Sequence, residues 1–162
     1  MRAVGFDPGL ADTGYAALEA GRGTLTVLGL GVIRTHRAES LEVRLEQLFE
    51  RAREVLERFA PDLLVVEDVF SAPAVPRTAI LMAHARAVIC LAGRQRNVEM
   101  VRVAPAEVKR AVTASGAAPK AQVARAMQAL LALPAPPRPS HVADALALAF
   151  TGLSRARGFG QR

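Results

Sequence analysis

The sequence contains no tryptophan, one tyrosine, one cysteine and only two lysines, Lys109 and Lys120. A single cysteine cannot form an internal disulfide, and Cys90 lies in an apolar run where a buried thiol is the ordinary state. The chain also lacks an apolar stretch long enough to cross a membrane, and its N-terminus does not follow the signal-peptide pattern. We therefore expect a cytoplasmic protein without membrane contacts, whose core stabilises it without disulfides.

The length, hydrophobic content and net charge of the chain favour a single basic domain. The chain has 162 residues, of which 51% are hydrophobic, so it can bury a substantial core. It carries 21 Lys and Arg against 15 Asp and Glu, a formal charge of +6, and all but two of the basic residues are arginine. A basic surface suits a polyanion such as nucleic acid, although many proteins are basic without binding one. We predict one domain over residues 1–153 and a basic, flexible tail over residues 154–162.

Apolar patterning predicts the element order β-β-β-α-β-α-β-α-α-α. The first three strands are joined by short turns, with Gly9 and Gly14 bracketing the first, which is typical of an antiparallel meander. Helices and strands then alternate, which favours a mixed sheet covered by helices on both faces. The expected strands are 2–7, 15–18, 25–33, 63–67 and 98–103, and the expected helices are 41–59, 78–95, 105–112, 120–131 and 140–153.

Carboxylates stand at the ends of apolar elements in three distant segments. Asp7 ends the first predicted strand, Glu67 ends the fourth, and Asp144 lies in the last helix. Such groups are costly to desolvate, and several brought together repel one another, so a divalent cation is their natural partner. The pattern predicts a metal-dependent site. Asp68 is left out of it because successive side chains of a strand point to opposite faces.

Several short motifs, taken in order, carry a resemblance to a known family. They are Gly-Phe-Asp-Pro-Gly at 5–9, Thr-Gly-Tyr at 13–15, Val-Glu-Asp-Val-Phe at 66–70, Ala-His-Ala-Arg-Ala at 83–87, Val-Lys-Arg at 108–110, Lys-Ala-Gln-Val at 120–123 and Ala-Asp-Ala-Leu-Ala at 143–147. The chain resembles the RuvC family of bacterial Holliday-junction resolvases, in the ribonuclease H-like nuclease superfamily. The resemblance implies an α/β fold with a mixed five-stranded sheet, and metal-dependent, symmetric nicking of four-way DNA junctions during homologous recombination and DNA repair.

The resemblance also implies roles for particular residues. Asp7, Glu67 and Asp144 match the family's metal ligands, which would hold two Mg²⁺ or Mn²⁺ ions for phosphodiester hydrolysis. Lys109 and Lys120 match basic residues near the site, where they would neutralise the scissile phosphate. We expect these five residues to form the catalytic centre.

His141 departs from the family pattern, since many members carry a fourth carboxylate there. It stands three residues before Asp144, so both side chains can reach one cluster from the same helix face. A neutral imidazole can ligate a divalent metal, and we include His141 among the metal ligands and, with the five residues above, in the catalytic centre. The alternative is a residue of the first helical turn with no metal role.

The remaining expectations concern DNA and protein partners. Phe70 would stack on bases of the opened junction, as in similar proteins, or else pack beneath its own loop. Arg77 and Arg86 are candidate phosphate contacts. The helix at 78–95 has an unusually wide apolar surface, which favours pairing with a second copy. RuvC-like enzymes are homodimers, and the RuvA/RuvB branch-migration complex is a further expected partner.

Three rival interpretations stay open at this stage. Residues 7–14 also resemble the phosphate loop of actin-like sugar kinases, but that fold needs a second lobe for which this chain has no room. A resolvase-like RNA-processing nuclease of the same superfamily is the second rival. A non-catalytic module that binds branched DNA is the third, and the intact set of Asp7, Glu67 and Asp144 argues against it.

Overall fold

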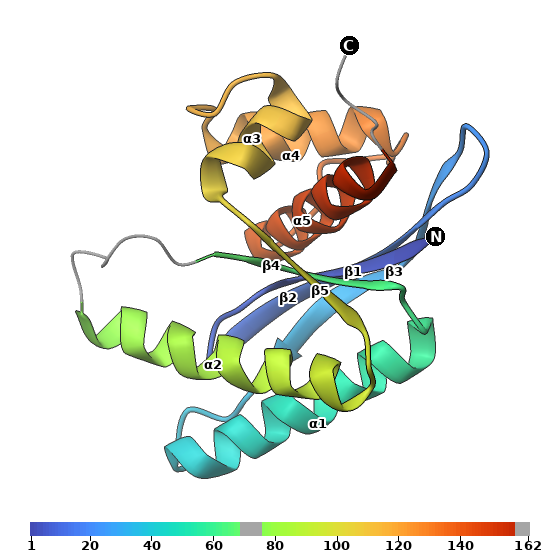
Figure 1. Ribbon diagram of the computed structural model, residues 1–162. Helices are drawn as coiled ribbons and strands as arrows, with labels where there is room; N and C mark the ends of the chain where they lie inside the picture. Colours follow the sequence, from blue (N-terminus) through green and yellow to red (C-terminus); the bar gives the residue numbers. More distant parts are fainter. Residues whose placement is uncertain (69–75, 158–162) are drawn as a thin grey trace.

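A computed structural model describes residues 1–68 and 76–157 of the chain (Figure 1). The element order is the predicted one. The strands are β1 Arg2–Asp7, β2 Asp12–Ala20, β3 Leu25–Arg34, β4 Leu63–Glu67 and β5 Glu99–Val103. The helices are α1 Leu41–Phe59, α2 Pro76–Gln95, α3 Pro105–Thr113, α4 Lys120–Leu130 and α5 Ser140–Arg157.

The strands form one mixed sheet in the order β3-β2-β1-β4-β5. β1, β2 and β3 pair antiparallel, whereas β1, β4 and β5 run parallel. Phe6 of β1 pairs with Val66 of β4, so these two neighbouring strands end side by side. Asp7 and Glu67 therefore leave the sheet at one edge. The α/β fold class predicted from the sequence is confirmed.

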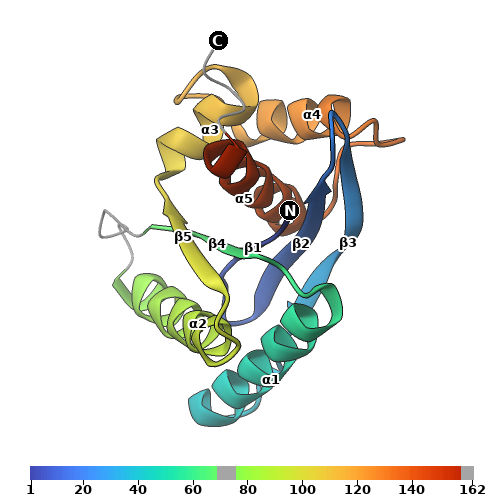
Figure 2. The ribbon, with the colours of Figure 1, turned by 45° about the vertical axis from the view of Figure 1, so that its right-hand side comes forward.

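Helices cover both faces of the sheet. Figures 1 and 2 show α1 and α2 on one face, and α3, α4 and α5 on the other. Successive side chains of β1 and β4 point to opposite faces of the sheet, so each strand contributes residues to both hydrophobic cores. The core beneath α1 and α2 includes Val4, Phe6, Leu64, Val66 and Ile89, and the core beneath the other helices includes Ala3, Leu63, Val65, Met127 and Leu146.

The helix boundaries follow ordinary capping chemistry. Ser40 caps α1, its Oγ accepting a hydrogen bond from the Val43 amide at 3.5 Å, and the helix ends at the left-handed residue Ala60. Pro105 occupies the first turn of α3, where its missing N–H is not needed. Among the helices in residues 1–68 and 76–157, none is both long enough and apolar enough to span a bilayer.

Two local expectations were wrong. The last helix continues past Leu153 to Arg157, so residues 154–157 are helical and do not belong to a tail. The Arg155 guanidinium donates a hydrogen bond to the Arg102 carbonyl of β5 at 3.2 Å, which ties this last turn to the sheet. β2 begins at Asp12, so Gly14 lies inside the strand and does not bracket a turn. The rest of the predicted tail, residues 158–162, lies outside the described residues.

Candidate active site

Two parallel strands carry the first two carboxylates to a shared edge. Asp7 is the last residue of β1, and Glu67 is the last residue of β4. The turn after Asp7 is braced by Thr13, a fully buried residue of β2. Its hydroxyl donates to the Gly9 carbonyl at 2.6 Å and accepts from the Gly9 amide at 3.2 Å. The chain beyond Asp7 is thereby fixed on one side of the site.

Helix α5 reaches this edge because two glycines let its backbone lie directly on the sheet. A Cβ at Gly5 of β1 would overlap the Ala145 carbonyl, and one at Gly14 of β2 would overlap the His141 carbonyl. Gly14 is also the residue paired with Asp7 across the β1–β2 ladder. The first turn of α5 thus packs on the backbone of Gly14, next to Asp7. This packing brings His141 and Asp144 near Asp7 and Glu67.

Asp7 and His141 are in direct contact. Nδ1 of His141 lies 2.6 Å from Oδ2 of Asp7, so the ring nitrogen donates to the carboxylate when it carries the proton. The Asp7 side chain is only 19% exposed. Burial raises the pKa of Asp7, the hydrogen bond from His141 opposes this shift, and the nearby negative charge of Asp144 adds to it.

Glu67 shares the same electrostatic environment. Burial raises its pKa most, and the charges of Asp7 and Asp144 raise it further. Lys120 and Lys109 oppose the shift through their positive charge. The three carboxylates predicted from distant parts of the sequence are therefore close enough in space to repel one another, and the two lysines are close enough to relieve part of that repulsion.

Lys120 is paired with the third carboxylate. Its Nζ lies 2.7 Å from Oδ2 of Asp144, and this hydrogen bond raises the pKa of Lys120. Lys120 is the first residue of α4, where a positive charge is unfavourable because the helix dipole is positive there too. The contact with Asp144 offsets that penalty. The lysine side chain remains 72% exposed, so the pair does not close the site to solvent.

The donor chemistry of the cluster fits a hard divalent cation. Asp7, Glu67 and Asp144 supply carboxylate oxygens, and their mutual repulsion is the condition that a bound cation relieves. Within residues 1–68 and 76–157 no three acidic, histidine or cysteine side chains already converge on one point. Asp7 is hydrogen-bonded to His141 and Asp144 to Lys120, so ligation would use carboxylates now paired with protein groups.

The predicted DNA-contacting residues lie around α2. Arg77 is exposed in the first turn of α2, and its contact with phosphate stays a prediction. Arg86 is half-buried: its Nε donates to the Glu67 carbonyl at 3.1 Å, and its other nitrogen lies 3.5 Å from Oδ1 of Asp68. Asp68 thus faces α2, away from the cluster, as strand alternation predicted. Phe70 lies outside the described residues.

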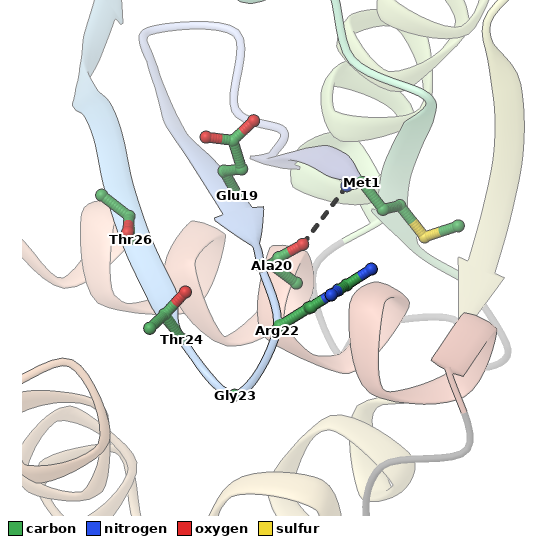
Figure 3. A pocket seen from close by; sticks show the side chains of 8 residues that line it. Met1, Glu19, Ala20, Arg22, Gly23, Thr24 and Thr26 are labelled. Carbon is green, nitrogen blue, oxygen red and sulfur yellow. Dashed lines mark hydrogen bonds between the residues drawn. The ribbon is translucent and has the colours of Figure 1, made fainter.

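A surface pocket at the opposite end of the sheet is separate from this cluster. It has a volume of about 630 Å³ and lies at the β2–β3 turn, between Glu19, Arg22 and Thr26 (Figure 3). The ammonium of Met1 donates a hydrogen bond to the Ala20 carbonyl at its wall, at 3.3 Å. Of the predicted site residues that the structure describes, none lines this pocket.

Similarity to known proteins agrees with this geometry. The family model described as crossover junction endodeoxyribonuclease RuvC matches residues 3–152. The chain belongs to the RuvC family. A crossover junction endodeoxyribonuclease RuvC from Streptomyces avermitilis is 43% identical, over 96% of this chain and 89% of the relative. The protein of the same name from Carboxydothermus hydrogenoformans is 39% identical, over 98% of this chain and 99% of the relative.

A solved structure extends the comparison to three dimensions. Thermus thermophilus RuvC in complex with Holliday junction substrate matches with a TM-score of 0.91 at 32% identity, over 98% of this chain and 97% of that chain. RuvC membership confirms the resemblance seen in the motifs and the assignment as a structure-specific endodeoxyribonuclease. It also implies, in general terms, dependence on a divalent metal ion.

Sequence reasoning missed the residues that hold the site in shape. In the sequence, Thr13 stands out only as part of a motif, Gly14 as a turn residue of the same motif, and Arg86 only as a candidate phosphate contact. Gly5, which lies inside the first predicted strand, carried a usable signal, since a glycine inside a strand often marks the close approach of another backbone. The contact of Arg86 with a carbonyl had no such signal in the sequence.

Proposed function

We propose that this protein is a Holliday-junction resolving endonuclease, which cuts four-way DNA junctions by symmetric nicking during homologous recombination and repair. The observation that supports the proposal is that Asp7, Glu67 and Asp144 lie near enough for their charges to raise the pKa of Asp7 and of Glu67, in a chain of the RuvC family. The two lysines near these carboxylates and the formal charge of +6 suit an anionic substrate such as a phosphodiester of DNA.

The carboxylates of Asp7, Glu67 and Asp144, together with the His141 imidazole, are the proposed ligands of two Mg²⁺ or Mn²⁺ ions. Bound ions of this kind supply an activated water and stabilise the leaving oxygen of a phosphodiester. Lys120, 72% exposed above the cluster, offers its ammonium to a phosphate on the open side. Lys109 adds positive charge close to Glu67. Both lysines would counter the charge that develops on the scissile phosphate.

The chain would act as a homodimer, because two nicks must be placed symmetrically in a junction with approximate two-fold symmetry. The outer face of α2 supports this: Ile80 is 57% exposed and Leu91 is 50% exposed, with exposed Ala83 and Ala87 between them. These four residues, one helical turn apart, form an apolar stripe. None of these four residues belongs to the carboxylate cluster of Asp7, Glu67 and Asp144, so pairing through α2 would not use the proposed metal ligands.

Replacing a residue of the apolar stripe with a charged residue tests whether the stripe forms the dimer interface. Ile80→Asp and Leu91→Asp are expected to elute as monomers in size-exclusion chromatography with light scattering. Leu130→Asp is the matched control, since Leu130 is an exposed leucine of α4 at 46%. A monomeric parent protein, or variants that stay dimeric, would contradict this part of the proposal.

Further elements of the proposed role follow from the family alone. The RuvA/RuvB branch-migration complex is the proposed protein partner, and the cytoplasm is the proposed location. Phe70, which belongs to the matched motif at 66–70, is proposed to stack on bases of the opened junction.

A substrate panel tests the proposal against its rivals. The purified protein is offered a synthetic four-way junction, a linear duplex of the same sequence and a structured RNA, each with and without Mn²⁺. We expect paired nicks in the junction that require Mn²⁺, and no comparable cutting of the duplex or the RNA. Preferred cutting of RNA would support an RNA-processing nuclease, and binding without cutting would support a non-catalytic module.

A further inference from the structure

Arg86 connects helix α2 to the strand that ends in Glu67. The residue lies on α2 between the exposed stripe and the buried face formed by Ala85, Ile89 and Ala92. Its side chain reaches the sheet edge, where Nε donates to the Glu67 carbonyl at 3.1 Å. The second arm of the guanidinium lies 3.5 Å from Oδ1 of Asp68. One side chain therefore contacts two successive residues at the end of β4.

The end of β4 is held from three directions. The Asp68 amide donates to the Val103 carbonyl of β5 at 2.8 Å, which extends the parallel ladder past Glu67. On its other side β4 pairs with β1 as far as Phe6 and Val66. Arg86 supplies the third support, from the face of the sheet covered by α2. Side chains alternate along β4, so Glu67 shares the opposite face with Val65, whereas Val66 packs beneath α1 and α2. The charges of Asp7 and Asp144 act on Glu67 there.

This arrangement favours a structural task for Arg86 over contact with DNA. The side chain is 21% exposed, compared with 72% for Lys120 at the open site. A guanidinium presents a fixed fork of N–H donors, so a hydrogen bond to a carbonyl and an ion pair with a carboxylate together restrict its orientation. A charge-assisted bond to a half-buried backbone carbonyl is also stronger than a neutral one.

We propose that Arg86 is a positioning residue for Glu67: it fixes the backbone at the end of β4, so that the Glu67 carboxylate is held toward Asp7 and Asp144. The proposal rests on the nuclease function proposed above, and it adds a residue that acts through Glu67 without touching the reacting atoms. Mutating a group that orients a metal ligand typically costs about 10- to 100-fold in metal affinity or activity.

Three variants separate positioning from phosphate contact. Arg86→Met keeps the length of the side chain without its charge, and Arg86→Lys keeps the charge without the fork. Arg94→Met is the matched control, because Arg94 is an exposed arginine of the same helix whose side chain donates to Asn97 at 2.9 Å. For each protein we measure the junction Kd in Ca²⁺, the single-turnover cleavage rate in Mn²⁺, and the rise in melting temperature that Mn²⁺ gives the protein alone.

The expected pattern is a loss of cutting without a loss of binding. Arg86→Met should cut about 10- to 100-fold more slowly, with an unchanged junction Kd and a smaller Mn²⁺-induced rise in melting temperature. Arg86→Lys should stay close to Arg86→Met, because one ammonium cannot make both contacts. Arg94→Met should match the parent in all three measurements. Comparable melting temperatures without metal show that the variants are folded.

The opposite pattern overturns the proposal. If Arg86→Met loses junction affinity by the same factor as cutting, and Arg86→Lys restores both, then Arg86 contacts phosphate and does not position Glu67. If the parent itself leaves the junction uncut, the proposed nuclease function fails instead. In that case the Mn²⁺-induced change in melting temperature still decides between positioning and no effect at Glu67.

Discussion

Nδ1 of His141 lies 2.6 Å from Oδ2 of Asp7, although 134 positions separate the two residues in the chain. The contact depends on a third residue that has no side chain. Gly14 pairs with Asp7 across β1 and β2 and lies beneath the backbone of His141. The first turn of α5 can therefore settle on the sheet edge where Asp7 ends β1.

Gly14→Ala should impair cleavage more than folding. The new Cβ would overlap the His141 carbonyl and come within 2.8 Å of the His141 Cβ, so the start of α5 must lift from the sheet. A displacement of about 1 Å at a catalytic group can reduce the rate by about 100-fold. The overpacking should lower the free energy of unfolding by roughly 1–3 kcal/mol.

Single-turnover junction cleavage and urea unfolding measure the two effects of Gly14→Ala. Gly116→Ala serves as the control, because the nearest atom to its new Cβ is the Ala106 carbonyl oxygen at 3.3 Å. A Gly14→Ala protein that cuts at the parent rate would show that the close approach of α5 does not set the site geometry.

Glu67→Gln should abolish cleavage yet stabilise the metal-free protein at neutral pH. The pKa of Glu67 is raised in the folded state, so folding favours its protonated form. The contribution of this group to stability is therefore full below its unfolded pKa and is lost as pH rises through the raised value. The uncharged amide of Glu67→Gln does not ionise, so the variant keeps this stability at neutral pH. Each kcal/mol gained would raise the melting temperature by roughly 2–4 °C in a protein of this size.

Thermal unfolding in EDTA, measured from acidic to neutral pH, tests whether Glu67→Gln stabilises the metal-free protein as predicted. The advantage of Glu67→Gln over the parent should shrink as pH falls through the raised pKa of Glu67, and it should be absent once the pH is below the ordinary carboxyl range. Glu46→Gln is the control, since Glu46 is an exposed carboxylate of α1. A Glu67→Gln protein less stable than the parent at neutral pH would mean that the clustered carboxylates do not repel one another as described.

Lys120→Ala should slow cutting far more than it weakens binding. The ammonium contacts Asp144 at 2.7 Å and is well placed to meet a phosphate at the same spot. Removing a preorganised charge of this kind can lower the rate by about 100-fold. Lys109→Ala should act in the same direction. Arg125→Ala, an exposed position of the same helix as Lys120, controls for the loss of one positive charge.

For these lysine variants, binding to a junction in Ca²⁺ is compared with single-turnover cleavage in Mn²⁺. A drop in affinity large enough to explain the slower cutting would make Lys109 and Lys120 ordinary backbone contacts.

His141→Asp should shift metal preference toward Mg²⁺. An imidazole suits Mn²⁺ better than Mg²⁺, which strongly prefers oxygen ligands, and a fourth carboxylate also adds negative charge to the site. Without metal, the new carboxylate would stand next to Asp7 and destabilise the protein. The test is the ratio of cleavage rates in Mg²⁺ and Mn²⁺ for both proteins. An unchanged ratio would leave His141 a residue of the first helical turn.

Much of this architecture could be predicted because it rests on local patterns. Continuous apolar runs ending in Asp7 and Glu67 indicated two buried strands with functional ends, and period-four apolar residues indicated α1 and its N-cap, Ser40. The spacing of His141 and Asp144 placed them on one helix face. Local pattern and tertiary fold agree at these positions, so sequence alone was informative.

The remainder depended on contacts between elements. The overlap that a side chain at Gly14 would cause appears only when α5 is laid on the sheet. Likewise, the sequence predicted a phosphate contact for Arg86 but gave no sign that its guanidinium donates a hydrogen bond to the Glu67 carbonyl. The extension of α5 to Arg157 also depends on a distant partner, the Arg102 carbonyl of β5.

The central claim is that the cluster at the end of β1 cuts a DNA junction with the help of metal ions, and Asp7→Asn tests it most directly. The substitution removes one carboxylate charge but adds little volume at a side chain that is 19% exposed. Affinity for the junction should persist, because it comes mostly from basic residues that contact phosphate. We predict a junction Kd in Ca²⁺ equal to that of the parent and no detectable cleavage in Mn²⁺. Cleavage by Asp7→Asn within a few-fold of the parent rate would contradict the account.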